Sequence, residues 1–134
     1  MRRIDRNLII QFSKFAVVGG IGFILDNVLV YLGIYALGMS RIAAGFFSFP
    51  FVVTFTWTGN RLFTFRESKR TALWPQLLKF MSVCAIGLLF NRGTYCLLVT
   101  TVSFVYAYPI LGLMAGTAVG MFFNFFIIRK HVFR

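Results

Sequence analysis

The sequence has little charge, and very little of that charge is negative. Only 13% of its 134 residues are charged and three are acidic, whereas 59% are hydrophobic. A soluble domain of this size has a large surface to solvate, and the polar residues for such a surface are missing here. The composition therefore excludes a soluble domain and indicates a membrane protein.

The residue types that carry most enzyme chemistry are also scarce. The single histidine, His131, lies in a basic cluster near the end of the chain, where we expect a surface residue. The two cysteines, Cys84 and Cys96, lie in one apolar stretch, too far apart to bridge each other, and have no ligand partners nearby. There is no paired-carboxylate site, no glycine-rich nucleotide loop and no nucleophile next to a base. The sequence thus predicts no enzyme, no metal and no cofactor.

The most extensive feature of the chain is a set of long apolar stretches, at about residues 15–37, 42–63, 80–100 and 104–128. Each is close to the ~20 residues that a helix needs to span the hydrocarbon core of a bilayer. None shows the alternating pattern of a membrane barrel strand. We therefore predict an all-α integral membrane protein, a single membrane domain over residues 1–134 with four transmembrane helices. A basic loop at about 66–78 separates the second helix from the third.

The net charge is +11, and the distribution of the basic residues indicates the membrane topology. Basic residues precede the first stretch, fill the middle loop and close the chain: Arg2, Arg3, Arg6, Lys14, Arg61, Arg66, Lys69, Arg70, Lys79, Arg129, Lys130 and Arg134. By the positive-inside rule, both termini and the middle loop are cytoplasmic. The basic excess then reflects topology and attraction to anionic lipid, and we predict no nucleic-acid binding. The first stretch is too long for a signal peptide and is expected to be retained.

The two halves of the chain resemble each other weakly. An offset of 65 residues aligns Lys14 with Lys79, Gly22 with Gly87, Asp26 with Asn91 and Asn27 with Arg92. An offset of 68 aligns the ends, Arg61…Phe65-Arg66 with Arg129…Phe133-Arg134. Because each half would hold two helices, the repeat would be parallel, about an axis along the membrane normal. Chance similarity is the alternative, and the polar residues at equal depth favour the repeat.

Asp26 is the most informative single residue, because it is a carboxylate in the middle of an apolar stretch. It lies ~18 Å along a helix from Lys14, near the bilayer centre, where a charge costs roughly 2.5–3.5 kcal/mol. Such a charge needs a partner, a cavity or a proton. Arg92 has a matching depth in the second half, and a pseudo-twofold axis would turn the two residues toward each other. One interpretation is a buried salt bridge that only fixes helix register.

The other interpretation is a polar cavity for a hydrophilic headgroup. Arg92 would bind phosphate, since a guanidinium forks onto phosphate oxygens and stays ionised when desolvated. Asp26 and the asparagines would bind sugar hydroxyls or hold Arg92 in place. Arg61 and Arg129 would either form a second phosphate site at the cytoplasmic helix ends or serve only as interfacial anchors. The candidate binding residues are Asp26, Asn27, Asn60, Arg61, Asn91, Arg92, Asn124 and Arg129.

Glycines indicate where helices pack. Gly112, Gly116 and Gly120 recur every four residues in the fourth stretch and form a smooth stripe suited to close helix contact. The contact would be either within the chain or with another copy of it.

Three segments in order resemble the GtrA-like family. They are the opening Phe12-Ser13-Lys14-Phe15-Ala16-Val17-Val18-Gly19-Gly20-Ile21-Gly22 followed by Asp26, then Asn60-Arg61-Leu62-Phe63-Thr64-Phe65, and the closing Asn124-Phe125…Arg129…Val132-Phe133. The resemblance covers roughly residues 10–134. It departs from the family pattern at Ile128, where an asparagine usually precedes the closing arginine, so the two halves are not expected to make identical cytoplasmic contacts.

The resemblance implies a multi-pass protein of the bacterial inner membrane that serves glycosylation of surface polysaccharide. It implies translocation of a polyprenyl-phosphate-linked sugar, such as an undecaprenyl phosphate sugar, to the outer leaflet. A separate membrane glycosyltransferase would then transfer the sugar to O-antigen or a related polymer. Two other functions stay open: a non-transporting anchor that recruits a glycosyltransferase, and a small proton-coupled multidrug exporter. Since four helices make a small groove, we also expect a homo-oligomer in contact with membrane lipid.

Overall fold

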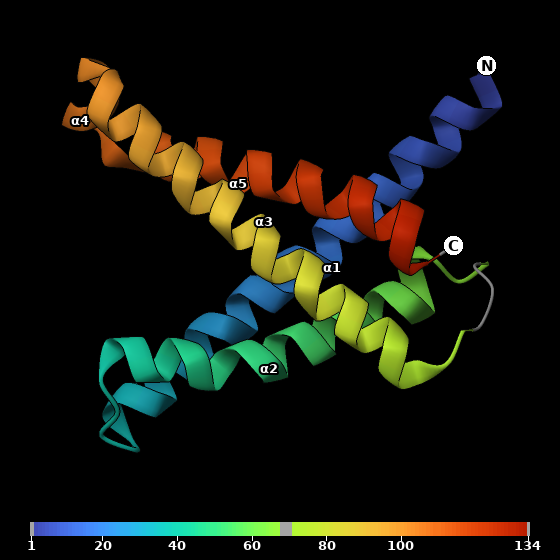
Figure 1. The fold of residues 1–134 in the computed structure, drawn as a ribbon, viewed down its shortest axis with the longest axis horizontal. Coiled ribbons are helices and arrows are strands. Elements are labelled where there is room, and N and C mark those ends of the chain that lie inside the picture. The colour runs from blue at the N-terminus through green and yellow to red at the C-terminus, as the bar shows by residue number, and fades with distance from the viewer. Residues whose placement is uncertain (1, 68–70, 134) are drawn as a thin grey trace. The chain divides into compact units, whose positions relative to one another are not determined.

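The computed structural model describes residues 2–67 and 71–133, with side chains from residue 6 onward. The basic residues Lys69, Arg70 and Arg134, which contribute to the predicted topology, lie outside the described residues. Every regular element within the described ranges is a helix (Figure 1). The chain divides into two compact units, Met1–Arg70 and Thr71–Arg134, which we call unit 1 and unit 2.

Unit 1 is a helical hairpin. Helix α1 spans Arg2–Tyr35, helix α2 spans Arg41–Gly59, and a π-helical turn, η1, continues α2 over Asn60–Thr64. The turn between the helices contains Gly38 at φ +67°, a left-handed conformation that glycine adopts without a Cβ clash. Ser40 then caps α2, because its hydroxyl oxygen accepts a hydrogen bond from the Ala43 N–H at 3.2 Å.

Unit 2 is a second hairpin with an extra short helix at its turn. Helix α3 spans Leu73–Thr101, α4 spans Ser103–Ala107, α5 spans Pro109–Ile127, and the π-helical η2 spans Ile128–Val132. The chain leaves helical geometry at Tyr108 because the following Pro109 disfavours it there. Pro109 itself is the first residue of α5, a position where its missing N–H costs nothing.

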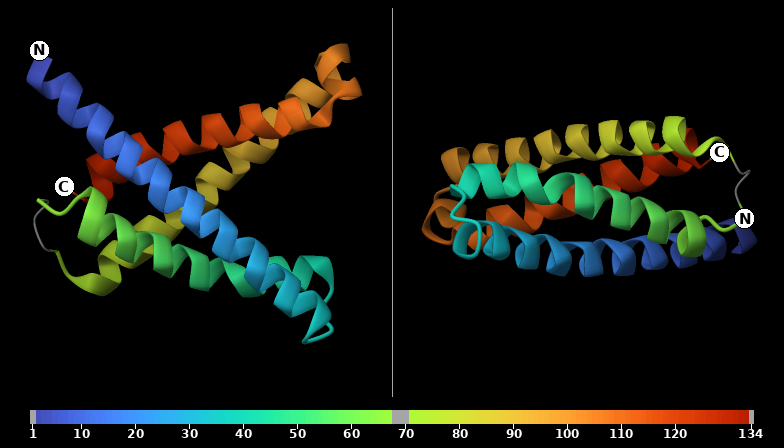
Figure 2. Two further views of the ribbon diagram at one scale, coloured as in Figure 1. Left: turned by 180° about the vertical axis from the view of Figure 1, so that it is seen from behind. Right: turned by 90° about the horizontal axis from the view of Figure 1, so that it is seen from below.

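The four predicted spans are confirmed as helices long and apolar enough to cross a membrane (Figure 2). The fourth begins later than predicted, at Pro109 instead of about residue 104, because the chain breaks at Tyr108 and leaves α4 as a separate short helix. Two others begin earlier: α1 begins at Arg2 instead of about residue 15, and α3 at Leu73 instead of about residue 80. Polar and charged residues such as Gln and Lys are good helix formers, so a helix continues past the end of its apolar stretch. The loop predicted at 66–78 is correspondingly shorter. The single-domain assignment, the parallel repeat and the cytoplasmic termini stay predictions.

Each unit has a narrow core where its two long helices meet. In unit 1, Gly22 of α1 lies against the Thr56 methyl group of α2, and Gly59 lies against Val18. In unit 2, the stripe of Gly112, Gly116 and Gly120 is buried against α3. The stripe predicted from the sequence is therefore a contact between helices of the same chain.

Most of the apolar surface is left outside these cores. The side chains of Phe23, Phe46 and Leu89 are 69%, 78% and 71% exposed. In water such a surface would drive aggregation, whereas in a bilayer it is solvated by lipid tails. The exposed apolar exterior, together with the four long helices, makes this a multi-pass membrane protein.

Candidate functional site

The Asp26 carboxylate is held at the crossing of α1 and α2. The hydroxyl of Ser48 donates a hydrogen bond to Asp26 Oδ1 at 2.6 Å and also lies 3.1 Å from the Gly45 carbonyl oxygen. Ser48 is fully buried, and Asp26 is half-buried. One carboxylate oxygen is thus fixed by the hairpin, and the other has no hydrogen bond among the described residues.

Ser48 is a residue that the sequence interpretation missed. It follows the buried Ala44 by four residues and so continues a stripe of small residues on α2. A small polar side chain on such a stripe, at the depth of an intramembrane carboxylate, is the signal that identifies the pair.

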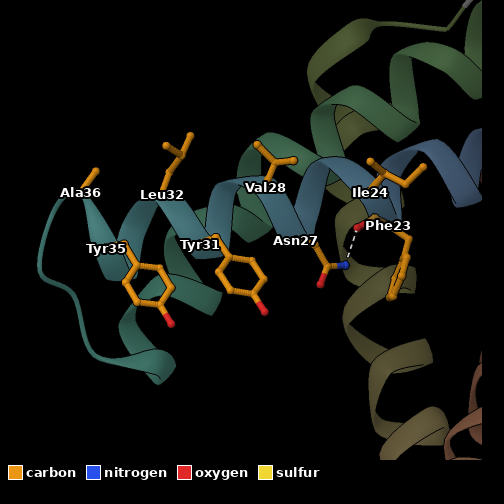
Figure 3. Close-up of a pocket in the computed structure, with 8 residues that line it drawn as sticks. All are labelled: Phe23, Ile24, Asn27, Val28, Tyr31, Leu32, Tyr35 and Ala36. Atoms are coloured by element: carbon orange, nitrogen blue, oxygen red, sulfur yellow. Dashed lines mark hydrogen bonds between the residues drawn. The ribbon is translucent and has the colours of Figure 1, made fainter.

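Asn27 lies next to Asp26 but points to a different side of α1. Its Nδ2 donates to the Phe23 carbonyl oxygen at 2.8 Å, one turn back in the same helix. The side chain is exposed and lines a groove of about 710 Å³ along the second half of α1 (Figure 3). Asn27 is therefore accessible to a ligand, whereas Asp26 is partly committed to the hairpin.

Asn91 occupies the helix crossing of unit 2. Its carbonyl and side-chain oxygens lie so close to Gly116 that any side chain at Gly116 would collide with them. Gly120 packs on the same residue, with an ideal Cβ 3.2 Å from Asn91 Cβ. Asn91 is thus half-buried against the glycine stripe, and its position is set by close backbone approach.

Asn124 faces α3 from the other side of the same crossing. Its side chain fills the space beside Gly87, where a Cβ would overlap the amide. The Asn124 Oδ1 atom is buried and has no hydrogen-bond partner among the described residues. A buried acceptor without a donor is unfavourable by about 1–3 kcal/mol.

Arg92 is the charged candidate residue of α3, and its side chain is exposed. It lies about 20 Å along the helix from Lys79 and about 14 Å from Thr101, well inside the apolar span. The structure gives its guanidinium no hydrogen bond or ion pair within the described part of unit 2. Asp26 and Arg92 belong to different units, and the ion pair between them stays a prediction.

Asn60 and Arg61 lie at the start of the π-helical turn η1. Asn60 is 2% exposed, and its Oδ1 accepts a hydrogen bond from the Thr64 hydroxyl at 2.8 Å. The Arg61 guanidinium lies over the Trp57 ring at 5.6 Å, and Lys14 Nζ lies 4.9 Å from the Phe63 ring centroid. Both cations therefore rest on aromatic faces near one end of unit 1, as expected for interfacial side chains.

The end of unit 2 has the same backbone geometry with different side chains. The Phe133 N–H donates to the Ile128 carbonyl at 3.0 Å, just as the Phe65 N–H donates to the Asn60 carbonyl at 2.8 Å. Ile128 is 0% exposed, and Arg129 beside it is exposed. The side chain of the buried Gln76 donates to the Val132 carbonyl at 3.2 Å and ties this turn to α3.

The departure at Ile128 has a physical reason in this geometry. The pair Asn60 and Thr64 forms a buried hydrogen bond in unit 1, and unit 2 has the apolar pair Ile128 and Val132 at the equivalent places. Replacing both partners of a buried hydrogen bond by apolar groups is nearly neutral, whereas replacing one is costly. The asparagine is therefore dispensable at the second position once its partner has also changed.

The structure thus groups the predicted residues by unit. Asp26 and Asn27 lie on adjoining sides of α1, Asn91 and Asn124 share one helix crossing, and Asn60 with Arg61 begins η1. Their contacts with substrate stay predictions. Of the described residues, no group of three His, Cys, Asp or Glu side chains is placed to hold a metal ion.

Comparison with protein families identifies the family of this chain. A family model described as the GtrA/DPMS transmembrane domain matches residues 14–133. The matched range includes the second, third and fourth spans, the first span from residue 14 onward, and every candidate residue. No curated protein matches the chain. The family match fits a glycosylation-related membrane protein.

Proposed function

The chain belongs to the GtrA/DPMS transmembrane domain family, and on this premise we propose that it translocates a polyprenyl-phosphate-linked sugar across the bacterial inner membrane. The headgroup moves from the cytoplasmic to the outer leaflet, and the polyprenyl tail stays in lipid. The sugar transfer itself belongs to a separate membrane glycosyltransferase. The acceptor is O-antigen or another surface polysaccharide, and the working form is a homo-oligomer.

The observation that carries this proposal is the environment of Arg92. Its guanidinium is exposed inside an apolar span and has no partner within the described part of its own unit. A charge at this depth costs roughly 2.5–3.5 kcal/mol unless an anion accompanies it. A lipid phosphate is such an anion, and its oxygens match the planar fork of an arginine.

The sugar has a complementary set of groups on α1. Asp26 has one oxygen fixed by Ser48 and one oxygen without a hydrogen bond among the described residues. The exposed Asn27 amide lies on the next side of the helix. A carboxylate and an amide are suitable partners for the hydroxyls of a sugar, which otherwise have no hydrogen-bonding group in hydrocarbon.

The test is translocation in liposomes. Purified protein is reconstituted with undecaprenyl phosphate bearing glucose, galactose or N-acetylglucosamine, and sugar exposure is followed with an external sugar-oxidising reagent. We expect accelerated exposure with at least one of these lipids for the wild type, and rates near those of empty liposomes for Arg92→Ala. Arg92→Lys should recover little activity, because an ammonium lacks the forked geometry. Arg41→Ala, at an exposed arginine at the start of α2, is the matched control and should keep the wild-type rate.

The rival functions predict different results. An anchor that recruits a glycosyltransferase predicts equal rates for wild type, Arg92→Ala and empty liposomes, with folding verified by circular dichroism. A multidrug exporter predicts increased resistance to quaternary ammonium compounds on expression. The exposed guanidinium of Arg92 argues against export of cationic drugs, because it would repel them.

A further inference from the structure

The second half of α1 carries a row of aromatic and polar side chains with a spacing of four residues. The row consists of Phe23, Asn27, Tyr31 and Tyr35, which lie one above the other along the helix (Figure 3). The two tyrosine rings are nearly parallel, at 10°, with centroids 5.8 Å apart. We call these four residues the aromatic row.

Packing does not explain the aromatic row. Phe23, Tyr31 and Tyr35 are 69%, 59% and 77% exposed. The residues of α1 that contact α2 include Gly22, Asp26 and Gly33. Phe23 and Asn27 directly follow the first two, and Tyr31 and Tyr35 each lie two residues from Gly33. One residue corresponds to a rotation of about 100° around a helix, so the row is turned well away from the hairpin core.

Anchoring at the membrane interface does not explain it either. Tyrosines concentrate at the water–lipid boundary, and this accounts for Tyr35 at the end of α1. The row, however, reaches back twelve residues to Phe23, about 18 Å along the helix and therefore over half of the hydrocarbon core. Placing the polar amide of Asn27 in hydrocarbon at that depth costs free energy unless a polar ligand forms hydrogen bonds with it.

The groove beside the row has two walls of different chemistry. The aromatic row lies along one wall, and Ile24, Val28, Leu32 and Ala36 lie along the other. Both rows belong to α1 and project to different sides of this helix in the view of Figure 3, so the groove is an open furrow on the helix surface. The groove has a volume of about 710 Å³ and is open along its outer side, so an occupant would stay in contact with the surrounding lipid. A suitable occupant has a polar, stackable face and an aliphatic part next to it.

We propose that this groove binds the sugar and the first isoprene units of a lipid-linked sugar, an assignment that rests on the function proposed above. The apolar C–H face of the sugar ring stacks on Tyr31 and Tyr35, whose π faces are electronegative. The two phenol hydroxyls, which have no hydrogen bond among the described residues, face sugar hydroxyls. Asn27 Nδ2 is used by the Phe23 carbonyl, so its Oδ1 accepts from the sugar. The isoprene units lie on the aliphatic wall.

The test compares lipids with and without a sugar. Thermal unfolding of the full chain in detergent is followed during titration with undecaprenyl phosphate and with its glucose, galactose and N-acetylglucosamine derivatives. A ligand at free concentration L that binds the folded state stabilises it by RT ln(1 + L/Kd), so the dependence of unfolding on lipid concentration gives relative dissociation constants. For the wild type we expect tighter binding of at least one sugar-bearing lipid than of the sugar-free lipid. Tyr31→Ala should weaken binding of that lipid about tenfold, equivalent to ~1.4 kcal/mol, and leave the sugar-free lipid unaffected.

Two further variants serve as controls. One separates the contribution of the Tyr31 ring from that of its hydroxyl, and the other tests whether the effect is specific to the groove. Tyr31→Phe keeps the stacking ring and should retain most of the sugar-dependent affinity. Tyr106→Ala removes a tyrosine of unit 2 that is 73% exposed and lies outside the groove, and should behave as wild type. The assignment is overturned if no sugar-bearing lipid binds more tightly than the sugar-free lipid, or if Tyr31→Ala weakens both lipids equally.

Lipid binding and translocation, measured separately, distinguish failure of the groove assignment from failure of the proposed function. Sugar-dependent binding that requires Tyr31, without translocation in liposomes, would support the groove and contradict the flippase proposal. Translocation with unchanged sugar binding in Tyr31→Ala would support the flippase proposal and contradict the groove.

Discussion

Units 1 and 2 share a backbone plan but differ in the side chains at equivalent positions. Both are hairpins of two long helices that end in a π-helical turn closed by a phenylalanine N–H. At the helix crossing, unit 1 has a hydrogen bond between Ser48 and Asp26, whereas unit 2 has Gly116 in direct contact with the backbone of Asn91. Unit 1 therefore fixes a carboxylate at its crossing, and unit 2 gains a closer helix contact instead.

The outward sides of α1 and α3 differ in a second way. Counted at the same offset of 65 residues, the aromatic row of α1 corresponds to Leu88, Arg92, Cys96 and Thr100 of α3. All four of these side chains are exposed, as in the aromatic row. The equivalent surface thus has aromatic rings and an amide in one unit and a single cation in the other. Such a division suits a ligand whose sugar and phosphate need different partners.

The largest expected effect comes from giving unit 2 the crossing of unit 1. Gly116→Ser would place a Cβ against the Asn91 backbone carbonyl, which cannot move aside as a flexible side chain would. Overpacking of this kind costs roughly 1–3 kcal/mol and more where backbone is involved. We expect a clear decrease in the free energy of unfolding, measured by denaturant titration in detergent.

The matched control for this variant is Gly93→Ser on α3. A Cβ at Gly93 has open space around it, so this substitution should change stability by less than about 0.5 kcal/mol, as surface changes usually do. Equal stability of Gly116→Ser and Gly93→Ser would show that the close contact at the crossing is not needed.

The contrast between the units also shows which structural features can be predicted from the sequence. The four spans and the glycine stripe follow from hydropathy and small-residue spacing, whereas the burial of Phe65 and Phe133 at the helix ends does not, because aromatic residues there are also typical of interfacial anchors. The helix starts at Arg2 and Leu73 do not, because polar residues with good helix propensity extend a helix beyond its apolar stretch. Ser48 was missed for another reason: its importance comes from which residue lies across the hairpin, and this depends on the rotation of α2 against α1.

The side on which a residue lies also separates Asp26 from Asn27. Their adjacent positions in the sequence predict one polar cluster. In the structure one contacts Ser48 of α2 and the other lines an exposed groove. Adjacent residues of a helix point about 100° apart, so they rarely share a partner. The aromatic row was missed because its spacing of four residues is also typical of ordinary lipid-facing side chains.

The second prediction replaces the polar residue on the outward side of α3 by its counterpart on α1. Arg92→Asn gives α3 the residue that α1 has at Asn27, and it should reduce translocation at least tenfold, equivalent to ~1.4 kcal/mol, with stability retained because Arg92 is exposed. The measurement is the liposome assay described above, together with thermal unfolding.

The reciprocal variant tests whether the units are interchangeable. Asn27→Arg combined with Arg92→Asn restores the cation count but moves the cation beside the aromatic row. We expect translocation to remain low, since a phosphate site and a sugar site would then coincide. Recovery to the wild-type rate would mean that only the number of membrane cations matters, and the division of roles between the units would be wrong.

The smallest expected effect concerns the hydrogen bond at the crossing of unit 1. Ser48→Ala removes the hydroxyl that donates to Asp26 Oδ1 and leaves the half-buried carboxylate without that donor. A lost hydrogen bond to a charged group costs about 1.5 kcal/mol or slightly more, and partial exposure of Asp26 lowers this to about 1 kcal/mol.

The control is Ser82→Ala on α3, because the Ser82 hydroxyl is exposed and bonds only within its own helix, to the Leu78 carbonyl at 2.9 Å. Denaturant titration should find Ser48→Ala less stable than Ser82→Ala, and combining Ser48→Ala with Asp26→Asn should recover part of the loss because a neutral amide needs the donor less. If the two serine variants are equally stable, the carboxylate is not supported by the crossing, and unit 1 gains nothing from having serine where unit 2 has glycine.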